Sequence, residues 1–72
     1  MTMSENRHGV PPQLNKPTVT GLILGVTTQT LANWRHAGRG PKWVKLGSAV
    51  RYSDESLRDF IEANTKTPGA AQ

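Results

Sequence analysis

The pattern of apolar and polar positions first predicts two short helices, with only three residues between them. Pro17 suits the first turn of a helix, where its missing N–H needs no partner, and Gly25 suits the position after the last turn, so a helix is predicted over residues 17–24. Thr27 can cap a second helix, predicted over residues 28–37, with a glycine directly after it. Two helices joined by such a short glycine-containing linker predict a helix-turn-helix.

Two strand-like runs follow the second helix. Residues 42–46 and 49–52 flank a Gly-Ser pair, which predicts an antiparallel hairpin with a two-residue turn. Side chains alternate between the two faces of a strand, and we expect Val44, Val50 and Tyr52 to point inward. A hairpin after a helix-turn-helix is typical of a wing.

The third helix is predicted to begin after Ser53, whose hydroxyl can cap it. Leu57, Phe60 and Ile61 recur at helical spacing and form one apolar face. The order of the elements predicts a mainly α fold with a small β-hairpin, a winged helix-turn-helix.

This domain is predicted over residues 14–64. Residues 1–13 contain few apolar side chains and a Pro-Pro pair, which predicts a disordered N-terminal arm, and residues 65–72 are predicted to form a flexible tail. The chain has 72 residues and no cysteine, and its longest apolar run is Leu22-Ile23-Leu24. We therefore expect a cytoplasmic protein with no membrane span and no signal peptide.

Charge is unevenly distributed in a chain whose formal net charge is +4. No acidic residue lies between Arg35 and Arg51, whereas the segment 53–62 is rich in aspartate and glutamate. A basic middle region favours a polyanionic partner, most often nucleic acid, and the alternative is a basic surface that only contacts solvent.

Candidate catalytic chemistry is absent from the sequence pattern. The two histidines, His8 and His36, have no partner at the spacing of a metal site or a catalytic triad, and no Gly-rich phosphate-binding loop follows a strand. An enzyme, a metal site or a cofactor is therefore not expected.

The second helix can be divided into a buried and an exposed face. Leu31 and Trp34 define the buried side, and at about 100° per residue the opposite side is polar. Glutamine and asparagine can pair bidentately with adenine in the major groove, although a solvated polar helix face is the alternative. The predicted DNA-binding residues of this recognition helix are Gln29, Ala32, Asn33 and His36 on that opposite side, and Thr28 and Arg35 on one flank of it.

The hairpin and the loop before it supply the other predicted DNA contacts. These residues are polar or basic and are expected to meet phosphates beside the groove. They are Arg39, Lys42, Lys45, Ser48 and Arg51. The alternative is that lysine on an edge strand only prevents sheet-to-sheet aggregation.

The motifs form an ordered series over LGVTTQTLANWRHAGRGPKWVKLGSAVRYSDESLRDFIEA. This series resembles the small winged-helix proteins of the phage excisionase and MerR-like group, over residues 17–63. The resemblance implies an excisionase, or recombination directionality factor, in a host bacterial cell. Such a protein binds and bends phage attachment-site DNA as multiple copies and directs a phage integrase toward excision. A small MerR-like transcriptional regulator would keep the same surface, and a protein–protein adaptor without DNA binding is the alternative of another class.

The sequence departs from its relatives in two places. Many relatives carry arginine at the wing tip, where this chain has Gly47-Ser48-Ala49, which leaves Lys45 and Arg51 as the phosphate contacts of the wing. In the first helix, Gly21 replaces a small packing residue, and two apolar residues would face outward. The candidate residues for head-to-tail self-association on DNA are Val19, Leu22 and Trp43. Trp43 could contact the third helix, DNA or a neighbouring copy. For the first helix, the alternative is a different helical phase, in which Val19 and Leu22 would not face outward.

Overall fold

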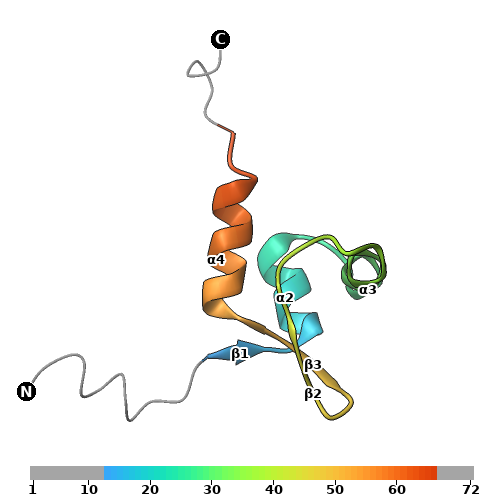
Figure 1. Ribbon diagram of the computed structural model, residues 1–72. Helices are drawn as coiled ribbons and strands as arrows, with labels where there is room; N and C mark the ends of the chain where they lie inside the picture. Colours follow the sequence, from blue (N-terminus) through green and yellow to red (C-terminus); the bar gives the residue numbers. More distant parts are fainter. Residues whose placement is uncertain (1–12, 67–72) are drawn as a thin grey trace, which may run out of the picture.

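The computed structural model describes residues 13–66, which form three helices and a small antiparallel sheet (Figure 1). The elements are β1 (Leu14–Asn15), α2 (Pro17–Leu24), α3 (Thr28–Ala37), β2 (Val44–Leu46), β3 (Ala49–Ser53) and α4 (Asp54–Ala63). This arrangement confirms the predicted winged helix-turn-helix. The arm and the tail predicted at the two ends lie largely outside the described residues.

Local capping interactions set the ends of the helices. The hydroxyl oxygens of Thr27 and Ser53 each accept a hydrogen bond, 3.0 Å long, from the backbone N–H three residues later. Gly25 and Gly38 follow α2 and α3 with φ angles of +73° and +71°, a left-handed conformation that glycine adopts without steric cost. The sequence-predicted bounds of these two helices are therefore correct.

The sheet contains a third strand that the sequence pattern did not predict. β1 pairs antiparallel with β3, so the strand order is β1-β3-β2. The side-chain amide of Asn15 donates hydrogen bonds to the Tyr52 carbonyl at 2.9 Å and to Asp54 Oδ1 at 2.8 Å. The backbone N–H of Asp54 donates to the carbonyl of Gln13 at 3.2 Å. These hydrogen bonds connect the segment before α2 to the start of α4.

The register of the hairpin corrects one expectation about its faces. Val44 pairs with Arg51 and Lys45 pairs with Val50. Directly opposed residues share a face of an antiparallel sheet, so Lys45 lies on the face of Val50 and Tyr52, and Val44 lies on the other. Tyr52 is buried, whereas Val44 is 44% exposed, so the expectation that Val44 points inward is wrong.

The core is small and joins helices to the sheet. Leu31 of α3, Tyr52 of β3 and Leu57 of α4 are its buried side chains, and the half-buried Trp34 packs against them. The Trp34 ring lies 5.4 Å from the Phe60 ring, centroid to centroid. The predicted buried side of α3 is confirmed, because Leu31 and Trp34 both face this core. No helix of the described part is long and apolar enough to cross a membrane.

The helix-turn-helix depends on a close backbone contact at Gly21. The Val26 N–H donates a hydrogen bond to the Gly21 carbonyl at 2.9 Å. A Cβ atom on Gly21 would lie 2.6 Å from the Val26 carbonyl oxygen, a separation that no side chain tolerates. The turn between α2 and α3 can close only because this buried position has no side chain.

We predict that Gly21→Ala lowers the free energy of unfolding by roughly 1–3 kcal/mol, as overpacking does in other cores. The higher helix propensity of alanine would act in the opposite direction, by about 1 kcal/mol. Urea denaturation measures the difference. Thr18→Ala, at an exposed position of the same helix, is the control and should change stability by less than about 0.5 kcal/mol. A stabilised Gly21→Ala protein would contradict the role given to this contact.

Candidate nucleic-acid interface

The exposed face of α3 presents two amide side chains that are already paired. Gln29 and Asn33 stand one helical turn apart, and the Gln29 Nε2 group donates a hydrogen bond to Asn33 Oδ1 at 3.0 Å. Both residues are exposed, as are Thr28 and His36, while Ala32 is partly buried. The bond leaves the amide oxygen of Gln29 and the amide nitrogen of Asn33 available as one acceptor and one donor. An adenine edge in the major groove offers the complementary donor and acceptor.

Arg35 lies at the edge of the exposed face of α3, on the flank where helical phase places it. It follows Leu31 by four residues, so its stem leaves α3 near the buried side, and the residue is half-buried. Its Nη1 group donates a hydrogen bond to the Tyr52 hydroxyl at 2.7 Å. Its Cζ atom lies 5.7 Å from the centre of the Trp43 ring, within range of a cation–π contact. Arg35 therefore bridges α3 and the hairpin segment, and Trp43, 40% exposed, meets Arg35 on one face.

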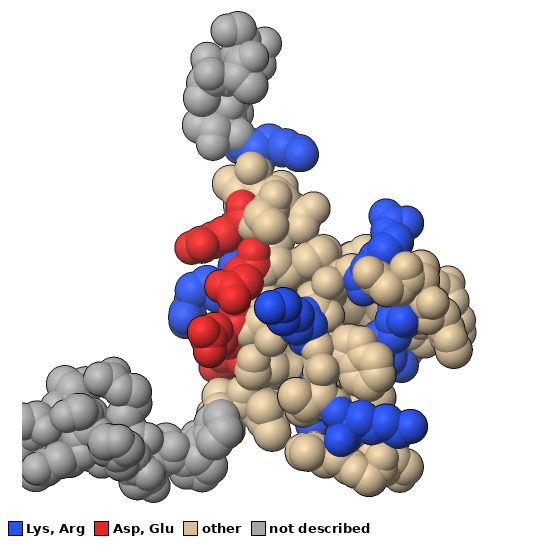
Figure 2. Space-filling model, in the orientation of Figure 1, with Lys and Arg blue, Asp and Glu red and all other residues tan. Residues whose placement is uncertain are grey.

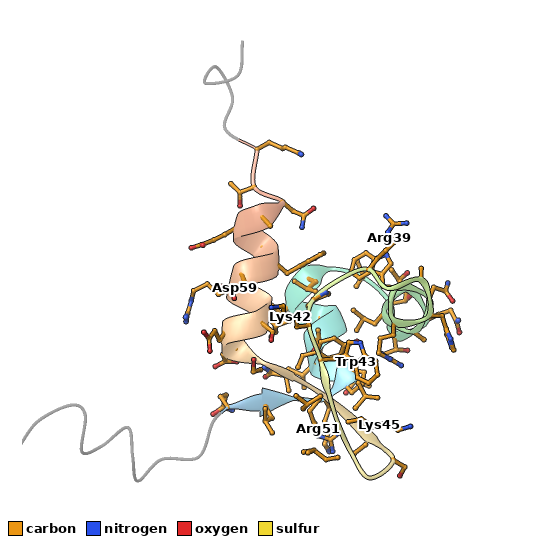
Figure 3. All side chains as sticks on the ribbon, in the orientation of Figure 1. Arg39, Lys42, Trp43, Lys45, Arg51 and Asp59 are labelled. Atoms are coloured by element: carbon orange, nitrogen blue, oxygen red, sulfur yellow. The ribbon has the colours of Figure 1, made fainter. Side chains whose placement is uncertain are left out.

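The two basic residues predicted on the wing lie on opposite faces of the hairpin. Lys45 is exposed and shares its face with Val50, on the side toward α3 (Figure 3). Arg51 is on the reverse face, is half-buried, and its Nη1 group donates to the neighbouring Val50 carbonyl at 2.8 Å. Ser48 is exposed in the turn between them. Of these two basic side chains, Lys45 therefore lies on the hairpin face that is turned toward α3, and Arg51 lies on the other face.

The loop between α3 and β2 places its two basic residues in different directions. Arg39 is exposed beyond the end of α3 (Figure 3). Lys42 is exposed beside α4, where it lines the same hollow as Asp59 and Phe60. Lys42 therefore has an acidic neighbour at this site, on the side of the loop that faces α4.

Figure 2 shows that charge is divided across the molecule. The acidic side chains of the described residues all belong to α4, and they gather on its outer side. Basic side chains lie over α3 and the hairpin on the other side. Two acidic residues in the first turn of α4 complement the positive end of its helix dipole, so they also serve the helix itself. The basic side is the one suited to a polyanion.

A recognition helix with an exposed amide pair, beside a basic two-stranded wing, defines a winged helix-turn-helix domain of the DNA-binding class. Residues 21–65 match the model of a helix-turn-helix domain family. The match covers more than half of the chain, and the protein belongs to this family, which includes excisionase-like DNA-binding proteins. No curated protein matches the chain.

Sequence reasoning placed the exposed face of α3 but missed what holds Arg35. The bond from Arg35 to Tyr52 joins residues 17 positions apart, in two different elements. Helical phase alone indicates that Arg35 lies near the buried side, because it follows Leu31 at i+4. The identity of its partners has no signal in the sequence.

We expect two classes of effect from substitutions on this surface. Gln29→Ala and Asn33→Ala should relax sequence preference, each at a cost of about 1–3 kcal/mol at a matched base. Lys45→Ala and Arg51→Ala should weaken binding to all sequences alike. Binding to a selected duplex and to a scrambled one measures both effects. Identical behaviour of the two pairs would contradict the division between base and phosphate contacts.

Proposed function

We propose that the protein is a sequence-specific DNA-binding excisionase, with α3 in the major groove and the hairpin beside it. The observation that carries the DNA-binding part is the exposed Gln29–Asn33 pair on a surface whose basic neighbours include Lys45 and Arg39. Thr28 and His36 flank the pair and would reach bases or phosphates at the same groove. Ala32 would contact the groove only through its exposed part, and Ser48 and Arg51 would reach the backbone from the wing.

The excisionase part of the proposal is supported by the ordered motifs over residues 17–63 and by membership of a family that includes excisionase-like proteins. In this role the protein would bind and bend attachment-site DNA in the cytoplasm of a host cell. It would direct a phage integrase toward excision without doing bond chemistry itself. The same DNA-binding surface would serve a small MerR-like transcriptional regulator, which is the second candidate.

Binding as several adjacent copies is part of the proposal. Leu22 is 84% exposed on α2, with Val19 of the same helix also exposed. The phase expected from the sequence, which turns these two residues outward, agrees with these exposures. A contact between this part of α2 and a different surface of the next copy would not close into a dimer, so such contacts would run head to tail along the DNA. Trp43 would contribute the face that Arg35 does not cover.

An excision assay with purified integrase and attachment-site DNA tests the role directly. We expect recombinant product to increase when this protein is added, because it would shape the DNA that integrase must synapse. Gln29→Ala should lose most of this stimulation. No stimulation, together with altered transcription from a promoter next to the binding site, would favour the regulator.

For self-association, we predict that Leu22→Asp reduces cooperativity on DNA with several adjacent sites, because a carboxylate would replace an apolar contact. Its affinity for a single site should equal that of the wild type, which serves as the internal control. Gel-shift titrations on one-site and multi-site duplexes make the comparison. Undiminished cooperativity would remove α2 from the contact.

A further inference from the structure

The guanidinium group of Arg35 lies where α3, the proposed recognition helix, packs against the hairpin. Tyr52, which is 1% exposed, accepts a hydrogen bond of 2.7 Å from Arg35, and the Trp43 ring lies against the same group. Tyrosine and tryptophan thus restrict the rotation of a side chain that is ordinarily very mobile. The orientation of the arginine is set before any ligand arrives.

No acidic side chain of residues 13–66 comes from the elements that hold Arg35. The carboxylates of these residues all belong to α4, and Figure 2 shows them on the outer side of that helix. Arg35 is nevertheless half-buried, so its charge is partly removed from water. A partly desolvated cation without a carboxylate partner attracts an anion from outside the protein.

The remaining donors of Arg35 suit one class of anion. The bond to Tyr52 uses one N–H of a planar fork, and the fork can donate further bonds. A phosphodiester accepts two parallel hydrogen bonds from a guanidinium group. A DNA strand bordering the groove that holds α3 would pass between α3 and the wing, next to exposed Lys45.

We propose that Arg35 is a phosphate-binding residue, oriented by Tyr52 and Trp43, that contacts one DNA backbone phosphate at the junction of recognition helix and wing. This inference rests on the proposed DNA binding and assigns Arg35 to the backbone instead of the bases. Tyr52 is a positioning residue in this scheme: it is buried, and it acts only through Arg35.

The test measures the affinity of the full chain for a labelled mixed-sequence duplex over a series of salt concentrations. Each neutralised phosphate adds about −0.9 to the slope of log K against log salt. Arg35→Ala should make the slope shallower by about that amount and lower affinity roughly tenfold on every sequence. Tyr52→Phe keeps the charge and the buried ring, so it should leave the slope unchanged and lower affinity by roughly threefold.

The matched control is Arg58→Ala, which removes the same charge from an exposed position on acidic α4 and should leave the slope unchanged. If Arg35→Ala unfolds, Arg35→Met replaces it in the test, because the unbranched methionine side chain can still pack against Trp43. Thermal unfolding followed by circular dichroism shows that each variant is folded.

If the wild-type protein shows a salt-dependent slope and Arg35→Ala or Arg35→Met shows the same slope, the inference about Arg35 is overturned, while the proposed DNA binding stands. The same holds if Arg58→Ala reduces the slope as much as the Arg35 variants do. If Tyr52→Phe binds as tightly as the wild type, Tyr52 has no positioning role. A flat salt response of the wild-type protein would overturn the proposed DNA binding itself.

Discussion

Tyr52 is buried where β1, the core and α3 meet, and it makes contacts with all three. Its ring occupies the core with Leu31 and Leu57, its carbonyl accepts a hydrogen bond from Asn15, and its hydroxyl accepts one from Arg35. One residue therefore connects β1, the core and the recognition helix. A domain of this size buries a small core, and a single central side chain can fix the position of each surrounding element. The wing keeps its place beside α3 for this reason.

The two sides of α3 differ: one packs on the core, and the other is exposed and carries the proposed base contacts. Leu31 and Trp34 attach the helix to the core, and Gly21 lets the preceding helix approach the turn closely enough to support it. The opposite side is free to carry Gln29 and Asn33. Within residues 13–66 the acidic side chains all belong to α4, so these carboxylates do not repel a polyanion from the basic side (Figure 2).

Features that depend on neighbouring residues were predictable from the sequence. The caps at Thr27 and Ser53 and the glycine after α3 involve contacts within a few positions, and the helices were predicted with these ends. β1 was missed because a two-residue strand carries no alternation pattern and forms only by pairing with β3. The inward placement of Val44 failed because alternation gives two faces but not the register, which pairs Val44 with Arg51.

In the candidate site too, local features were predictable and contacts between distant residues were not. Helical phase placed Gln29 and Asn33 on the exposed face, because α3 buries one stripe. The environment of Arg35 could not be predicted, since it depends on Tyr52 and Trp43, which the hairpin brings to it. The opposite faces of Lys45 and Arg51 follow from the register and from nothing local.

In the proposed complex α3 and the hairpin form the DNA-binding surface, and α4 faces away from the DNA. Mapping of backbone amide chemical shifts by NMR during titration with duplex DNA tests this arrangement most directly. We expect the largest shifts in the first turns of α3, in the loop at Arg39 and in the hairpin around Lys45. Largest shifts along the acidic face of α4, or no shifts at low salt, would contradict this arrangement.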